Sequence, residues 1–219
     1  MSKKVLVILS GCGVYDGAEI HESVLTLLAL DKADAAISYA APDIAQHHVI
    51  DHLTGEPMEG ETRNVLVESA RIARGDIKAL AQCNASDYDA VILPGGFGAA
   101  KNLCSFVFDG ADMKVNPELE TFLKAAHELG KPLGFACIAP AIAAKLFGHK
   151  KVTFTIGNDE ATSAPLQSFG GMHADKAVNE IVVDENLKIV TTPAYMLAQR
   201  ISEAEAGINK MVETVLKMA

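Results

Sequence analysis

The sequence predicts an α/β fold in which helices cover both faces of a largely parallel sheet, a doubly wound three-layer sandwich. Short runs rich in Val, Ile and Leu alternate along the 219 residues with segments whose apolar residues follow a helical spacing. A hydrophobic fraction of 49% is enough for a sizeable core. Neither an internal repeat nor a low-complexity linker interrupts this alternation, so we expect a single domain over 1–219.

The first half of the chain is expected to hold two strands and two helices. Apolar residues at a helical spacing, among them Val24 and Leu28, predict the first helix. Pro42 stops the second strand, and the second helix has Thr62 as its cap and Gly75 as its stop. In order, the elements are a strand over 3–10, a helix over 18–33, a strand over 35–42, a polar loop with room for a short hairpin over 43–60, and a helix over 61–74.

The second half continues the alternation. Asn116 as N-cap and Pro117 at the first helical position predict a helix that ends at Gly130. The residues "DEN" at 184–186 are typical of a hairpin turn. In order, the elements are a strand and glycine turn over 88–98, a helix over 116–130, a strand over 132–136, a helix over 138–147, a strand over 151–157, a hairpin over 180–192, and a long amphipathic helix over 195–219.

Charge and composition restrict the partners. A net charge of -9 repels phosphate backbones and anionic lipid, so neither nucleic acid nor a membrane surface is expected as a partner. The apolar runs stay well below the roughly 20 residues of a membrane span. The start, "MSKKVLVILSGCG", lacks the features of a leader, so we expect a cytoplasmic protein. Without a C-x-x-C pair, the four cysteines read as reduced thiols: Cys12, Cys83, Cys104 and Cys137.

Three loops point to one candidate site. They are "SGCGVYDGAE", "PGGFGAAKN" and "FACIAP", and each follows a predicted strand. In open α/β sheets, ligands bind beyond the carboxyl ends of the strands, so we expect these loops to meet there. Cys137 lies where a strand turns into a helix, a position at which the helix N-terminus lowers a thiol pKa and offers free amides. On this stretch alone, an activated nucleophile and a buried packing cysteine are equally supported.

The other two loops supply acids and backbone amides. Glu19 and Glu22 share one face of the first helix, where one can cap the helix and the other can point at the site. Gly95 and Gly96 allow a close approach of backbone to ligand, although an ordinary tight turn explains them as well. Cys12 either lines the same pocket or is simply small enough for its turn, and the second interpretation is slightly favoured.

Several stretches together resemble the ThiJ/PfpI group, and within it the ElbB-type glyoxalases, also called enhancing-lycopene-biosynthesis proteins. The matching stretches include "VILSGCGVYDGAEIHESVLTLLAL", "ETRNVLVESARIARG", "LPGGFGAAKNL", "GKPLGFACIAPA" and "KIVTTPAYMLA". The resemblance implies a flavodoxin-like, class I glutamine amidotransferase-like sandwich whose nucleophile elbow carries Cys137. It further implies Glu22 against the thiol, the amides of Gly96 and Ile138 as the oxyanion site, and a homodimer. The implied activity converts the small aldehyde glyoxal to glycolate without a cofactor.

The sequence departs from the patterns of related enzymes at two places, and each departure excludes a reaction from those expected. The stretch "TTPAYM" lacks the histidine of glutamine amidotransferases, so glutamine hydrolysis is not expected. Thr155 stands where some relatives carry a histidine after the elbow helix, and without a general acid peptide hydrolysis is not expected. The hypothesis is therefore a Cys137 thiohemiacetal with Glu22 as acid and base. Glu19 and His21 are possible supporting residues, and Cys12 is another.

Three alternatives compete with this hypothesis. A dinucleotide-binding module is disfavoured, because Asp16 stands where G-x-G-x-x-G needs its third glycine. A redox sensor or partner-binding protein remains open, in which an oxidisable Cys137 supports little turnover. His48 and His52 are spaced for a metal on a helix, but their segment is polar and offers no evident third ligand, so no metal is expected.

Overall fold

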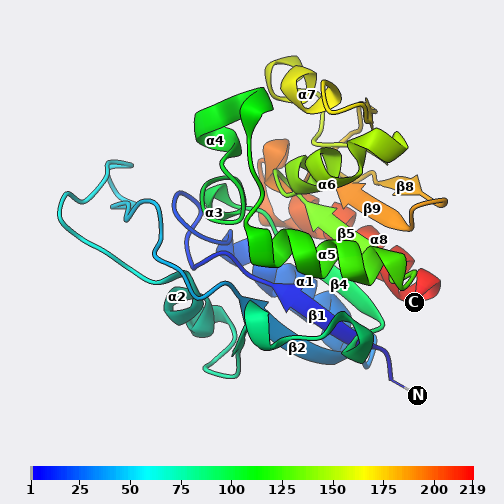
Figure 1. The fold of residues 1–219 in the computed structure, drawn as a ribbon, viewed down its shortest axis with the longest axis horizontal. Coiled ribbons are helices and arrows are strands. Elements are labelled where there is room, and N and C mark those ends of the chain that lie inside the picture. The colour runs from blue at the N-terminus through cyan, green and yellow to red at the C-terminus, as the bar shows by residue number, and fades with distance from the viewer. Residues whose placement is uncertain (1) are drawn as a thin grey trace.

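A seven-stranded sheet in the order β3-β2-β1-β4-β5-β9-β8 forms the centre of the molecule (Figure 1). The structure is a computed structural model that describes residues 2–219. All neighbouring strands of this sheet are parallel except β8 and β9. The strands are β1 (Lys4–Ile8), β2 (Ala36–Ala41), β3 (Lys78–Ala79), β4 (Ala90–Leu93), β5 (Leu133–Ala136), β8 (Val182–Asp184) and β9 (Ile189–Thr192).

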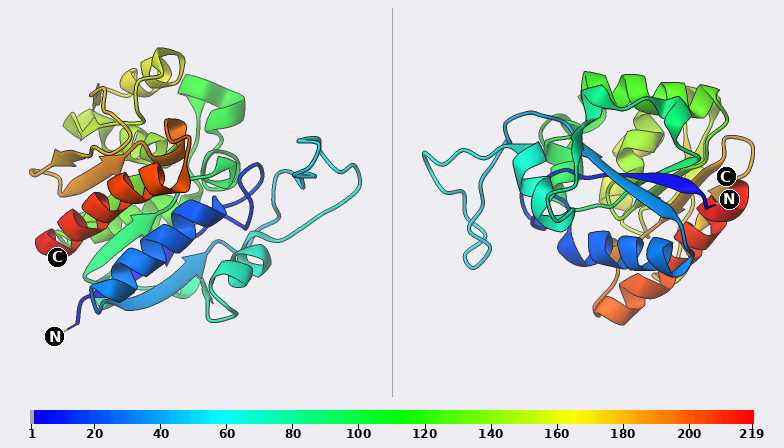
Figure 2. Two further views of the ribbon diagram at one scale, coloured as in Figure 1. Left: turned by 180° about the vertical axis from the view of Figure 1, so that it is seen from behind. Right: turned by 90° about the horizontal axis from the view of Figure 1, so that it is seen from below.

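Helices cover both faces of this sheet. α1 and α8 lie on one face and α5 and α6 on the other, with a separate apolar core between each pair and the strands (Figure 2). The helices are α1 (Ile20–Lys32), α2 (Val65–Ile72), α3 (Phe97–Lys101), α4 (Phe106–Asp109), α5 (Pro117–Glu128), α6 (Pro140–Phe147), α7 (Glu160–Gln167) and α8 (Ile201–Met218). The three-layer, doubly wound fold predicted from the sequence is therefore confirmed.

The strand order determines where a ligand can bind. Along the central parallel strands the order β2-β1-β4-β5-β9 is that of the flavodoxin-like fold. The direction of winding reverses between β1 and β4, so the crevice beyond their carboxyl ends is the expected binding position. β1, β4, β5 and β9 run parallel, so the loops that follow them all lie at this edge.

Three expected elements differ from the structure. The second helix starts at Val65, because the side chain of Asn64, not Thr62, accepts the hydrogen bond that caps it (3.0 Å from the Val67 amide). The strand expected over 151–157 shrinks to β6 (Thr153–Phe154), which pairs with β7 (Met172–His173) in a small separate sheet.

The last helix also begins later than expected. It starts at Ile201, after a short 3-10 turn over Ala194–Met196. Ala194 has a left-handed backbone (φ 44°), which an α-helix does not contain, and the Tyr195 amide that follows donates to the Glu22 carboxyl group.

An extended arm leaves the body between β2 and α2 (Figures 1 and 2). The predicted short hairpin is present, since Ile50 and Pro57 form an antiparallel bridge. The Leu53 side chain at its tip is 97% exposed. Within residues 2–219, no helix combines the length and the apolar character that a membrane crossing requires.

Candidate active site

Cys137 occupies a strained turn between β5 and α6. Its backbone is left-handed (φ 60°), a conformation that costs a non-glycine residue on the order of 1–3 kcal/mol. The turn is held by the Cys137 amide, which donates to the Thr192 carbonyl at 2.9 Å. The side chain is only 8% exposed and lies at the base of a pocket. This is the nucleophile-elbow geometry that the sequence suggested.

Glu22 reaches Cys137 from α1. Its side chain is fully buried, and its carboxyl group and the Cys137 thiol shift each other's pKa. One carboxyl oxygen accepts from the Gly95 amide (2.9 Å) and the other from the Tyr195 amide (3.1 Å). A Cβ on Gly95 would lie 2.4 Å from the Cys137 Cβ and 2.7 Å from the Glu22 Oε2 atom, so only glycine fits between them.

Two backbone amides face the sulfur. The amides of Gly96 and Ile138 both lower the pKa of the Cys137 thiol. Gly96 has a φ of 93°, and a Cβ there would lie 2.4 Å from the Gly17 carbonyl oxygen, so the loop is as tight as its glycines allow. Donors arranged around a nucleophile in this way can also stabilise an oxyanion formed on its substrate.

Burial determines the charge states of the pair. It raises the pKa of Glu22 from 4.5 to about 7, and the amides of Tyr195 and Gly95 only partly oppose this. The pKa of Cys137 is raised as well, first by burial and then by the charge of Glu22. The Gly96 and Ile138 amides lower the thiol pKa as expected, but the effect of burial is larger. The sequence predicted a net decrease in the Cys137 pKa, and this prediction is wrong because the pKa is raised.

The possible supporting residues fall in three different positions. Glu19 caps α1 through a 2.7 Å hydrogen bond from the Glu22 amide and lines the pocket, so it positions the helix turn that carries Glu22. His21 is exposed, and its Nδ1 atom lies 2.8 Å from the Tyr195 hydroxyl. Cys12 is not among the residues that line the pocket and interacts instead with the charges of Glu68 and Arg71, which agrees with the favoured structural interpretation.

Sequence reasoning missed the residues that enclose the pocket. Tyr195 was assigned to the last helix, whereas its amide binds Glu22 and its side chain lines the cavity. The stretch "TTPAYM" was the available signal, because it begins in the last residues of β9 and continues beyond the edge where that strand ends. Much of the remaining wall comes from α3, α4 and α7, and none of these three helices was predicted.

The pocket above Cys137 has a volume of about 380 Å³. Most of its lining residues are apolar. The lining residues are Val14, Glu19, Gly96, Phe97, Ala100, Phe106, Val107, Cys137, Ile138, Ala161, Thr162, Tyr195 and Met196.

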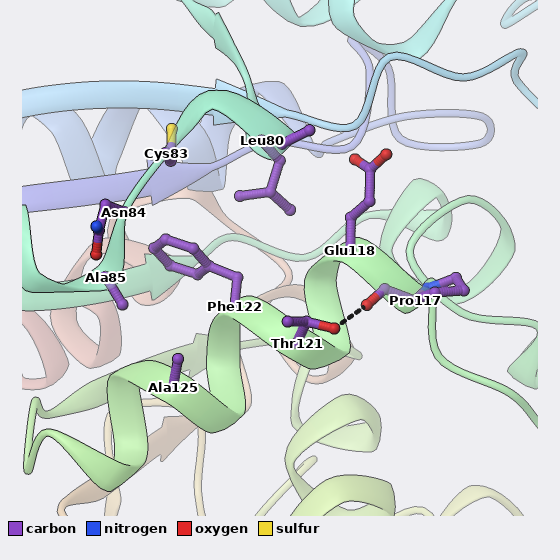
Figure 3. Close-up of a pocket in the computed structure, with 10 residues that line it drawn as sticks. Leu80, Cys83, Asn84, Ala85, Pro117, Glu118, Thr121, Phe122 and Ala125 are labelled. Atoms are coloured by element: carbon purple, nitrogen blue, oxygen red, sulfur yellow. Dashed lines mark hydrogen bonds between the residues drawn. The ribbon is translucent and has the colours of Figure 1, made fainter.

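A second hollow of about 500 Å³ lies on the flank of the molecule, between α5 and the segment 80–85 (Figure 3). Phe122 and Leu80 form its apolar base, and the Thr121 hydroxyl donates a hydrogen bond to the Pro117 carbonyl oxygen at 2.8 Å. None of the predicted site residues lines it. We therefore assign the candidate site to the smaller pocket.

The histidines do not form a metal centre. The His48 ring packs against Phe108, whereas the His52 Nε2 atom lies 3.8 Å from the Asp16 Oδ1 atom. The two imidazoles therefore contact different residues. Over residues 2–219, His, Cys, Asp and Glu side chains nowhere gather in a group of three that could hold a metal ion.

Together, the flavodoxin-like sheet and the elbow cysteine define an α/β protein of the class I glutamine amidotransferase-like kind. The profile of the DJ-1/PfpI family matches residues 3–199. The chain belongs to the DJ-1/PfpI family, and the broader part of the resemblance seen in the sequence is thereby confirmed.

Individual relatives are similar over almost the whole chain. The human "Glutamine amidotransferase-like class 1 domain-containing protein 3, mitochondrial" is 48% identical over 98% of this chain and 83% of its own length. The rat "ES1 protein homolog, mitochondrial" is 48% identical over 98% of this chain and 84% of its own. A solved Ehrlichia chaffeensis "isoprenoid biosynthesis protein with amidotransferase-like domain" is 35% identical, with a TM-score of 0.91 over 99% of this chain and 100% of that one.

One further structure shows the fold alone. Glyoxalase III from Candida albicans has a TM-score of 0.65 at 16% identity, covering 99% of this chain and 97% of its own. The cytoplasmic location expected from the sequence is contradicted, because the human, rat and zebrafish relatives are all named mitochondrial. That expectation rested only on the lack of leader features at the start of the sequence.

Proposed function

We propose that this protein is an ElbB-type glyoxalase that converts glyoxal to glycolate without a cofactor. The observation that carries the proposal is the contact of a strained, amide-flanked thiol with a buried carboxyl group whose pKa is about 7. An acid with this pKa can accept and return a proton near neutrality. The similarity to the Ehrlichia isoprenoid biosynthesis protein supports the subfamily assignment.

In the proposed reaction, the Cys137 sulfur forms a bond to one aldehyde carbon while Glu22 takes the thiol proton. The amides of Gly96 and Ile138 stabilise the resulting oxyanion. Glu22 returns this proton to the oxyanion, so that a neutral thiohemiacetal forms and the carboxylate is freed. The carboxylate then takes the proton of the first carbon and gives it to the second oxygen, which forms an enediol, and the first hydroxyl loses its proton as the second carbon gains one. The first carbon is oxidised to a thioester and the second is reduced to an alcohol. Water cleaves the carbon–sulfur bond, releases glycolate and restores the thiol.

The competing functions have weaker support. A redox sensor needs an accessible, low-pKa thiol, whereas Cys137 is buried and its pKa is raised. Glutamine hydrolysis is not proposed, despite the name of the human relative. Of the residues that line the pocket, none is a histidine, and His21 faces the Tyr195 hydroxyl instead.

Glycolate formation from glyoxal tests the proposal directly. We expect Cys137→Ala to abolish turnover and Glu22→Gln to lower it by about 10²–10⁴-fold, because general acid–base catalysis contributes that much. Cys83→Ala is the matched control, since this half-buried cysteine lies outside the pocket. Wild-type turnover in Cys137→Ala would eliminate the proposed nucleophile. An inactive wild type combined with rapid, selective peroxide oxidation of Cys137 would favour the sensor.

A further inference from the structure

The pocket is much larger than glyoxal requires. Glyoxal has four non-hydrogen atoms, and even a water molecule's share of liquid is about 30 Å³, so glyoxal fills on the order of 100 Å³. The cavity measures about 380 Å³. Cavities from about 300 Å³ upward are the ones that hold ligands of drug size. Most of the cavity would therefore hold only water when glyoxal is bound.

The additional space is bounded by apolar groups. Most of the lining residues are apolar, and the uncharged polar side chains among them are Thr162 and Tyr195. The apolar set includes Phe97, Phe106, Val107, Ile138, Met196 and the exposed Ala161 of α7. Phe97 and Val107 remain 45% and 42% exposed in the empty pocket, so an apolar ligand would remove their surfaces from water. Such burial is favourable in proportion to the apolar area covered.

The charged groups of the pocket are all acidic. Glu19 lines the cavity and Glu22 lies directly behind the thiol, whereas neither Lys nor Arg is among the lining residues. Lys101 lies over the Phe97 ring at 5.2 Å but donates to the Tyr15 carbonyl, outside the lining. A substrate carboxylate or phosphate would meet repulsion here and no cationic partner.

We propose that the preferred substrates of this site are uncharged 2-oxoaldehydes whose ketone carries an apolar group of about ring size. This proposal rests on the proposed glyoxalase function and adds the substrate class. Phenylglyoxal is the probe: its aldehyde carbon bonds to Cys137 and its ring lies against the apolar wall. The overall reaction has the same stoichiometry as that of glyoxal. The aldehyde carbon is oxidised, the ketone carbon is reduced, and one water is taken up to give mandelate.

The test compares kcat/KM for glyoxal, phenylglyoxal and 4-carboxyphenylglyoxal, measured as the hydroxy acid formed. Product must be measured because arginine side chains also consume these reagents. We expect phenylglyoxal to exceed glyoxal by about tenfold or more, the scale of discrimination that apolar pocket contacts provide. The carboxylated ring should lose about tenfold or more relative to phenylglyoxal, because its charge has no partner.

Variants at the rim separate this proposal from intrinsic differences in reactivity. Ala161→Asp places a carboxylate in the pocket lining and should lower the ratio of kcat/KM for phenylglyoxal to kcat/KM for glyoxal about tenfold. Ala161→Leu should retain the preference. Ala164→Asp is the matched control, because Ala164 is exposed on the same helix but outside the lining.

The outcomes of the two proposals are distinguishable. Glycolate formation with an equal or lower kcat/KM for phenylglyoxal would overturn the substrate class and leave the glyoxalase proposal standing. Equal losses in Ala161→Asp and Ala164→Asp would also overturn it. If wild type forms neither glycolate nor mandelate, both proposals fail together.

Discussion

At the scale of single residues, Glu22 links the stability of the fold to its chemistry. Its pKa is raised from 4.5 to about 7 because the carboxyl group is fully buried. The folded state therefore holds a proton that the unfolded chain releases between these pH values. The contribution of Glu22 to stability is greatest below pH 4.5 and is lost as the pH rises through about 7, by roughly 3 kcal/mol in total.

Urea unfolding across this pH window measures that loss. Wild type should lose roughly 3 kcal/mol relative to Glu22→Gln between about pH 4.5 and pH 7.5, because the amide does not titrate. The comparison with Glu22→Gln cancels the other carboxyl groups. A constant difference between the two proteins would show that Glu22 titrates normally in the folded state.

The same titration predicts how the rate depends on pH. The proposed reaction requires the Cys137–Glu22 pair to have lost one proton, since Glu22 must accept the proton of the thiol. We expect kcat/KM to rise about tenfold per pH unit below the pKa of about 7 and to level off above it. A plateau already present at about pH 5 would contradict a base with a raised pKa.

Gly95 is the residue at which geometry alone predicts a loss. A Cβ there would lie 2.4 Å from the Cys137 Cβ and 2.7 Å from the Glu22 Oε2 atom, so Gly95→Ala must push the two groups apart. We expect a decrease in kcat/KM of about 100-fold, the effect of misplacing catalytic groups by about 1 Å. Gly60→Ala is the control for activity, because a Cβ at Gly60 would meet no atom within 4 Å and the strain of a side chain at its φ of 79° arises outside the pocket. Equal activities would refute the close packing described above.

At the scale of elements, periodicity located the segments that build the core and failed for those that enclose the pocket. Continuous apolar runs predicted β1, β4 and β5, and the Asn116–Pro117 pair predicted the start of α5 correctly. α7 was not predicted because it contains Pro165, a residue that is unfavourable inside a helix. The turn at 194–196 escaped because its sequence continues the apolar pattern of α8, and only tertiary contacts place Tyr195 beside Glu22.

The extended arm offers a test of which contacts stabilise an element. The buried Asp16 carboxylate accepts from the Ile50 amide at 2.8 Å and anchors the base of the arm, whereas Leu53 at the tip contacts mostly solvent. Asp16→Ala should lower the free energy of unfolding by about 1–3 kcal/mol, because it leaves a buried amide without a partner. Leu53→Ser should change it by less than about 0.5 kcal/mol in urea unfolding. The reverse order would mean that the tip is buried in solution.

At the scale of the whole molecule, the candidate site follows from topology. Cys137, Glu22 and Gly96 lie far apart in the sequence, yet each follows a strand that ends at the same sheet edge. The sequence could therefore predict that these residues meet, although their catalytic roles remain predictions. It could not predict that burial would raise the thiol pKa, because burial depends on how α1, β5 and β9 pack together.

The homodimer expected from the family resemblance remains a prediction, and α1 suggests how to test it. Ile20, Val24 and Leu28 recur every four residues on one face of this helix and are 44%, 51% and 42% exposed. If a second copy covers this stripe, light scattering should give twice the chain mass of 23.2 kDa.

Val24→Asp should then yield monomers, because a carboxylate would be buried without a partner. Val67→Asp, at an exposed valine on α2, controls for the added charge. A monomeric wild type would contradict the dimer itself, whereas a Val24→Asp dimer would place its interface elsewhere.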